Sequence, residues 1–219
     1  MKKVAIILSG CGVYDGSEIH EAVLTMLFVE QQGAQYRCFA PNIAQYHVIN
    51  HLTGEVSEHE SRNVLVESAR IARGDIEDIS ALNEQDYDAL IVPGGFGAAK
   101  NLCDFAIKGK DCTVQPQVLA ACQRFAKANK PAGYMCIAPA MVALIYGKNS
   151  QATIGSDQAT ATQLAMMGLE HVQCAVDDIV IDHKNKVIST PAYMLAGNIK
   201  EAATGINKLV SELLAMAAS

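Results

Sequence analysis

The sequence lacks the features that mark several large functional classes. Basic residues are not in excess: 17 lysines and arginines stand against 23 aspartates and glutamates, giving a net charge of −6. A chain of this net charge has no excess of positive charge with which to bind nucleic acid or an anionic membrane. No apolar run approaches the roughly twenty residues that a membrane-spanning helix needs. We therefore expect a small, uncharged or polar partner, and neither nucleic acid nor membrane.

Paired cysteine motifs are missing as well. The seven cysteines form no CxxC pair and no cysteine–histidine spacing typical of zinc sites, and their odd number fits no disulfide framework. We expect no metal, no cofactor and a reducing compartment. The apolar run at residues 4–8 is too short for a secretory signal, so the sequence predicts a cytoplasmic protein.

Short apolar runs alternate with helical patterns along most of the chain. Strands are predicted at 3–8, 35–41, 87–93 and 131–135, and helices at 17–32, 115–129 and 198–215. Residues 42–60 alternate around a Thr-Gly turn and predict a small β-hairpin inserted beside the sheet. The pattern predicts one α/β domain over residues 1–219, a doubly wound, mostly parallel sheet of flavodoxin-like type with helices on both faces.

Three loops leave the carboxyl ends of predicted central strands, where doubly wound sheets bind their ligands. They read CGVYDGSE, PGGFG and CIAP. In the third, Cys136 stands between a strand and a helix, as in a nucleophile elbow, and the helix N-terminus is expected to lower its pKa. A small core thiol fits the position equally well. The other cysteines are interpreted as core residues, although Cys11 and Cys103 lie near enough to strand ends to act as resolving thiols.

The first loop supplies carboxylates. With Asp15 as the helix cap, Glu18 falls at the third helical position and completes a capping box. Glu21 is then not needed to cap the helix. If the Glu21 side chain is partly buried, its pKa would be raised and the carboxyl group would suit proton transfer. An exposed helical glutamate is the plainer interpretation.

The second loop holds more glycine than a strand-to-helix turn requires. Gly94 and Gly95 allow backbone N–H groups to face a ligand closely. Together with the N–H of Ile137, directly after the cysteine, they could bind an oxyanion. A plain tight turn is the alternative interpretation.

The segments PGGFGAAKNL and YMCIAPAMVAL, in this order after Glu21, resemble the PfpI superfamily. The resemblance covers nearly the whole chain and implies the class I glutamine-amidotransferase-like α/β fold. It is strongest to a branch of glyoxalases once described as isoprenoid-biosynthesis or lycopene-enhancing proteins. It implies Cys136 as nucleophile, Glu21 as its acidic partner, Gly95 and Ile137 as oxyanion donors, and a homodimer.

The resemblance also implies an activity. Superfamily members that hydrolyse peptides or glutamine carry a histidine after the cysteine, where this chain has Ile137, so amide hydrolysis is not expected. The expected function is a glutathione-independent glyoxalase of the lyase class that converts glyoxal or methylglyoxal to glycolate or lactate. Cys136 would form a hemithioacetal and Glu21 would move protons. An alternative stays open, a redox-sensing or chaperone-like module in which Cys136 is oxidised.

Overall fold

A seven-stranded sheet in the order β3-β2-β1-β4-β5-β9-β8 forms the centre of the computed structural model, which describes residues 1–218. The strands are β1 (Lys3–Ile7), β2 (Gln35–Ala40), β3 (Ile76–Asp78), β4 (Ala89–Val92), β5 (Ala132–Met135), β8 (Val180–Asp182) and β9 (Val187–Thr190). All neighbours pair in parallel except β8, which runs antiparallel to β9. A separate parallel pair joins β6 (Gln151–Ala152) to β7 (Glu170–His171).

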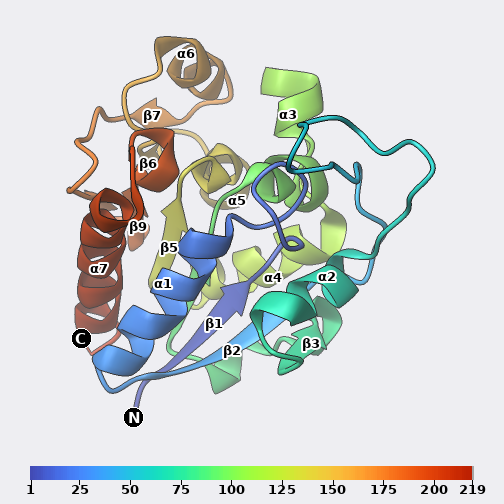
Figure 1. Ribbon diagram of the computed structural model, residues 1–219. Coiled ribbons are helices and arrows are strands. Elements are labelled where there is room, and N and C mark those ends of the chain that lie inside the picture. Colours follow the sequence, from blue (N-terminus) through green and yellow to red (C-terminus); the bar gives the residue numbers. More distant parts are fainter. Residues whose placement is uncertain (219) are drawn as a thin grey trace.

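Helices cover both faces of this sheet. They are α1 (Ile19–Gln31), α2 (Val64–Ile71), α3 (Phe105–Lys108), α4 (Pro116–Lys127), α5 (Val142–Tyr146), α6 (Gln158–Met166) and α7 (Ile199–Met216). In Figure 1, α1 and α7 lie in front of the strands and α4 lies behind them. The predicted doubly wound, mostly parallel α/β fold is confirmed.

The alternation of buried side chains along β1 explains the two layers. Val4 and Ile6 point to the face covered by α1, α2 and α7, whereas Ala5 and Ile7 point to the face covered by α4 and α5. All four side chains are fully buried, as expected for a parallel strand between two helical layers.

Capping side chains fix where the longer helices begin. The Gln115 side chain accepts the Val118 N–H at 2.8 Å, directly before Pro116 opens α4. Asn198 does the same for α7, accepting from the Glu201 N–H at 3.0 Å. Each cap satisfies a backbone donor that has no partner within the helix.

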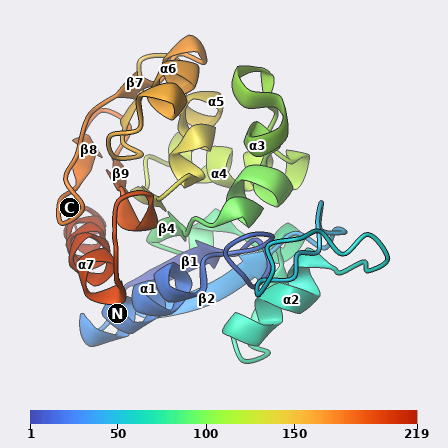
Figure 2. The ribbon, with the colours of Figure 1, turned by 45° about the horizontal axis from the view of Figure 1, so that its top comes forward.

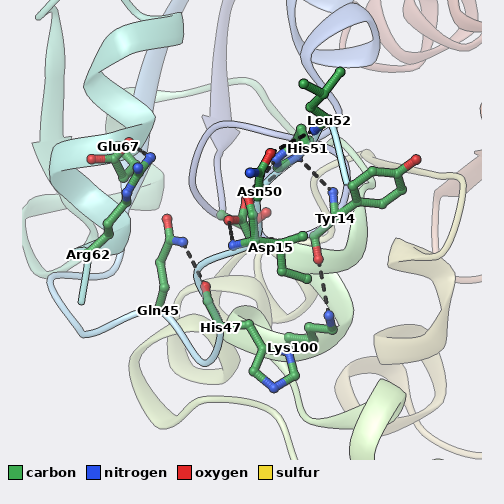
Figure 3. Close-up of polar contacts among 12 residues, drawn as sticks. Tyr14, Asp15, Gln45, His47, Asn50, His51, Leu52, Arg62, Glu67 and Lys100 are labelled. Carbon is green, nitrogen blue, oxygen red and sulfur yellow. Dashed lines mark hydrogen bonds and ion pairs between the residues drawn. The ribbon is translucent and has the colours of Figure 1, made fainter. Parts of the chain in front are cut away.

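The predicted hairpin at 42–60 is a loop with two isolated antiparallel bridges, Ala44 to Asn63 and Ile49 to Val56. Side chains tie it to the loop after β1 (Figure 3). The Ile49 N–H donates to Asp15 Oδ2 at 2.7 Å, and the Tyr14 N–H donates to His51 Nε2 at 3.2 Å. Figure 2 shows this segment projecting beside α2. Asp15 therefore holds this loop and does not cap α1.

No helix within residues 1–218 is both long and apolar enough to cross a membrane.

Candidate active site

Cys136 occupies a strained turn directly after β5. Its φ is +59°, a left-handed conformation that residues other than glycine rarely adopt. The Cys136 N–H donates to Thr190 O at 3.1 Å, which fixes the turn against the end of β9. A 3-10 turn at Ala138–Met141 follows, and only then α5. The predicted elbow is present, and the helical segment after it begins as a 3-10 turn and ends with α5 at Tyr146, directly before Gly147.

Glu21 lies in the first turn of α1 with no solvent exposure. Two backbone donors hold its carboxyl group: the Gly94 N–H reaches Oε2 at 2.8 Å and the Tyr193 N–H reaches Oε1 at 3.1 Å. The Cys136 side chain lies beside the same carboxyl group. Glu21 is therefore buried against the sulfur, surrounded by donors, rather than an exposed helical glutamate.

Gly94 makes this contact sterically possible. A Cβ atom on Gly94 would lie 2.4 Å from Cys136 Cβ and 2.8 Å from Glu21 Oε2. Because its N–H is bound to Glu21, Gly94 positions that carboxyl group and does not face a ligand as the sequence suggested. The N–H groups of Gly95 and Ile137 do face the Cys136 sulfur.

Burial controls the electrostatics of the pair. It raises the pKa of Glu21 to about 8, and the nearby charge of Glu18 adds to this effect. Burial also raises the pKa of the Cys136 thiol well above its usual range, and the Glu21 charge raises it further. The amides of Gly95 and Ile137 oppose these effects more weakly. The predicted lowering of the Cys136 pKa is therefore wrong, because desolvation outweighs the dipole of a short turn.

A cavity of about 360 Å³ opens onto the sulfur. Its lining comes from six separate parts of the chain and is largely apolar: Val13, Glu18, Gly95, Phe96, Ala99, Phe105, Ala106, Cys136, Ile137, Thr160, Tyr193 and Met194. The three loops predicted to converge do so, as the Phe96 N–H donates to Val13 O at 2.8 Å. The 42–63 segment contributes no lining residue.

Sequence reasoning missed two polar residues beside the cavity. Glu18 is the cap of α1, accepting the Glu21 N–H at 2.7 Å, and it also lines the cavity, where burial raises its pKa. His20 Nδ1 lies 2.8 Å from the hydroxyl of Tyr193, another lining residue. Their position in the loop after a central strand was the available signal. His183, in the turn between β8 and β9, is exposed.

No group of three or more histidine, cysteine, aspartate or glutamate side chains able to hold a metal ion occurs among residues 1–218.

Two curated mammalian proteins are similar to the chain along most of its length. The ES1 protein homolog of Rattus norvegicus is 45% identical over 221 residues, spanning 97% of this chain and 83% of that protein. The glutamine amidotransferase-like class 1 domain-containing protein 3 of Homo sapiens is 44% identical and spans 97% and 82%. No family model matches the chain.

Solved structures agree with this relationship. An isoprenoid biosynthesis protein with an amidotransferase-like domain from Ehrlichia chaffeensis superposes with a TM-score of 0.90 at 37% identity, covering 97% of this chain and 99% of that one. A DJ-1 superfamily protein of Salmonella typhimurium shares the fold, with a TM-score of 0.57 at 19% identity over 100% of this chain and 89% of that one. The chain belongs to the glutamine amidotransferase-like class 1 domain proteins.

The relatives overturn one expectation. Both mammalian proteins are named as mitochondrial, so the predicted cytoplasmic location is wrong. The cysteine pattern indicates a reducing compartment, but it does not indicate which membrane encloses that compartment.

Proposed function

We propose that the protein is a glutathione-independent glyoxalase that converts 2-oxoaldehydes to 2-hydroxy acids. The observation that carries the proposal is the placement of the Cys136 sulfur beside the buried Glu21 carboxyl group, where an apolar cavity opens. A thiol beside a carboxyl group surrounded by donors is a nucleophile with its own base. Among residues 1–218, no lysine, arginine or histidine lines the cavity to bind an anionic substrate.

The first step joins substrate to sulfur. Glu21, as carboxylate, accepts the thiol proton while the sulfur attacks the aldehyde carbon and forms a hemithioacetal. The N–H groups of Gly95 and Ile137, which face the sulfur, stabilise the negative charge that develops on the aldehyde oxygen. Because both acids have raised pKa values, the thiol is ionised only as it reacts.

Proton transfers complete the reaction. Glu21 first returns the thiol proton to the hemithioacetal oxygen and is a carboxylate again. It then takes the proton from the former aldehyde carbon and delivers it to the neighbouring carbonyl oxygen, giving an enediol. The hydroxyl group on the sulfur-bearing carbon gives its proton to Glu21, which protonates the neighbouring carbon and leaves a thioester. Water adds to the thioester carbonyl, the carbon–sulfur bond breaks, and the 2-hydroxy acid leaves with Cys136 as thiol again. The substrate is oxidised at one carbon and reduced at the other, so no outside electron acceptor is needed.

Lactate formation from methylglyoxal without glutathione tests the proposal. Cys136→Ser should abolish turnover, and Glu21→Gln should lower kcat by about 100-fold or more. In the wild type, kcat/KM should rise with pH through about 8, where Glu21 loses its proton. Wild-type turnover by either variant contradicts the scheme.

Oxidation sensing at Cys136 is the weaker candidate. Its side chain is only 8% exposed, and its raised pKa leaves little of the reactive thiolate.

A further inference from the structure

A hydrogen-bonded pair of aromatic side chains stands at one side of the largely apolar cavity. Tyr193 lines the cavity, and its hydroxyl oxygen lies 2.8 Å from Nδ1 of His20. The two rings are tilted against each other, with their centroids 5.7 Å apart. The His20 side chain is half-exposed, so it holds the tyrosine hydroxyl group from the solvent side.

The backbone of Tyr193 is fixed to the candidate active site. Tyr193 lies in the 3-10 turn Ala192–Met194 that follows β9, and its N–H donates to Glu21 Oε1 at 3.1 Å. The residue before it, Ala192, is fully buried and has a φ of +45°. A left-handed conformation at a residue other than glycine is strained, and such residues cluster at functional sites. The turn therefore starts the Tyr193 side chain beside the carboxyl group that lies next to Cys136.

The surroundings of His20 favour a hydrogen on its Nδ1. Glu18 Oε1 lies 4.0 Å from that nitrogen, and Glu18 Oε2 accepts the Glu21 N–H at 2.7 Å, which holds the carboxyl group in place. A carboxyl oxygen beside a ring nitrogen favours the tautomer with a hydrogen there. The Nδ1–H group then donates to the Tyr193 oxygen. Tyr193 consequently keeps its own O–H as a donor for a ligand in the cavity.

We propose that Tyr193 donates a hydrogen bond to the second carbonyl oxygen of a 2-oxoaldehyde, and that His20 is the positioning residue that orients its hydroxyl group. The inference rests on the proposed glyoxalase activity and assigns the residue that distinguishes 2-oxoaldehydes from simple aldehydes. Negative charge develops on the second oxygen when Glu21 removes the proton from the sulfur-bearing carbon. A donor aimed at that oxygen stabilises the transition state more than the bound substrate.

Steady-state kinetics with methylglyoxal as substrate and propanal as competitive inhibitor test the proposal. Propanal has the same three-carbon chain and can form a hemithioacetal, but it lacks the second carbonyl group. Tyr193→Phe should lower kcat/KM for methylglyoxal about 10- to 100-fold, because a hydrogen bond to developing charge is lost. The inhibition constant of propanal should keep its wild-type value. Wild-type kcat/KM in this variant overturns the proposal, and so does an equal weakening of propanal, which would show a general disturbance of the cavity.

Two substitutions of His20 separate orientation of the hydroxyl group from packing. His20→Leu removes the donor and should lose about as much kcat/KM as Tyr193→Phe. The double variant should lose no more than either single variant, because both remove the same contact with the substrate. Asparagine places an amide nitrogen near the position of Nδ1, so His20→Asn should recover most of the loss. His183→Leu, at the exposed histidine between β8 and β9, is the control and should leave kcat/KM unchanged. Additive losses overturn the assignment of His20.

Failure of this inference can be distinguished from failure of the proposed activity. If the wild type makes no lactate, the glyoxalase function is wrong, and binding can be measured without competing turnover. Methylglyoxal and propanal, isotope-labelled at the aldehyde carbon, then show the hemithioacetal by NMR as a signal that is lost in Cys136→Ser. Lower occupancy by methylglyoxal but equal occupancy by propanal in Tyr193→Phe supports the inference. Equal occupancy by both aldehydes, or no signal with methylglyoxal in the wild type, overturns it.

Discussion

Contact between Cys136 and Glu21 depends on the absence of a side chain at Gly94. In Gly94→Ala the new methyl group would lie 2.9 Å from the Cys136 sulfur. We expect the sulfur and the carboxyl group to be pushed apart, with a loss of turnover on the order of 100-fold. Overpacking should also destabilise the fold by about 1–3 kcal/mol. Kinetics with methylglyoxal and urea unfolding measure the two effects.

Gly197→Ala is the matched control for this substitution. The nearest atom to a Cβ there is Glu201 Oε2 at 3.6 Å, an ordinary contact. This variant should keep wild-type turnover and stability. Equal losses in the two alanine variants would show that steric exclusion at Gly94 is not the cause.

The raised pKa of Glu21 also predicts how stability changes with pH. The folded protein keeps the Glu21 proton up to about pH 8, whereas the unfolded chain loses it near 4.5. Between these values only the folded state binds this proton, so stability falls as pH rises, by about 1.4 kcal/mol per pH unit. Urea unfolding of wild type and Glu21→Gln at several pH values should show that this contribution is lost in the variant. If the stability of the two proteins changes with pH in the same way, Glu21 is not the group responsible for the pH dependence.

Single residues of the site could be predicted only in part. The strand pattern before Cys136 was sufficient to place it at the edge of the sheet where parallel strands end. Glu21 was assigned as its partner only through the family resemblance, because its position in a helix favoured an exposed glutamate. The raised pKa of Cys136 was not predictable, since it depends on how completely the rest of the fold excludes water from the sulfur. The hydrogen bond from the Gly94 N–H to Glu21 was not predictable either, because it too depends on how the rest of the fold packs.

Helices α3 and α6 contribute to the wall of the cavity. The cavity has room for a substrate larger than methylglyoxal. Its volume of about 360 Å³ and apolar lining favour a 2-oxoaldehyde with a large apolar group. We expect phenylglyoxal to have a lower KM than methylglyoxal. Burying the ring is worth about 2 kcal/mol, or roughly 30-fold. Steady-state kinetics with both aldehydes make the comparison.

A substitution on α3 checks this preference. Ala106 is exposed yet lines the cavity, so Ala106→Phe should fill part of the space without disturbing the core. The KM for phenylglyoxal should rise while that for methylglyoxal stays the same. If both values change equally, the cavity does not select by size.

Elements with strong local patterns were predictable, and those set by their neighbours were not. The apolar run of β1 and the capped amphipathic helix α4 agree with the sequence. The strand β3 was missed because two of its three residues, Ile76–Asp78, are carboxylates and the segment gains strand structure only by pairing with β2. In α1, the apolar residues Val23 and Leu27 are 47% and 42% exposed. The buried face instead includes Glu21 and Thr25.

For the whole molecule, the homodimer implied by the superfamily remains a prediction, and α1 offers a surface for it. Ile19, Val23 and Leu27 recur every four residues and are exposed, so they form one apolar stripe. We expect sedimentation to give twice the chain mass, and Val23→Glu to give the single chain. Val66→Glu, at an exposed apolar residue of α2, is the control and should remain dimeric. A monomeric wild type excludes the dimer.

The outermost strands of the sheet, β3 and β8, have only three residues each. An exposed sheet edge offers backbone donors and acceptors to any other extended chain, and long flat edges promote polymerisation. Here each edge provides little more than one repeat of the hydrogen-bonding pattern, and each ends in an aspartate, Asp78 or Asp182. Such short edge strands give a second copy of the chain little backbone to pair with, which limits edge-to-edge association of folded molecules.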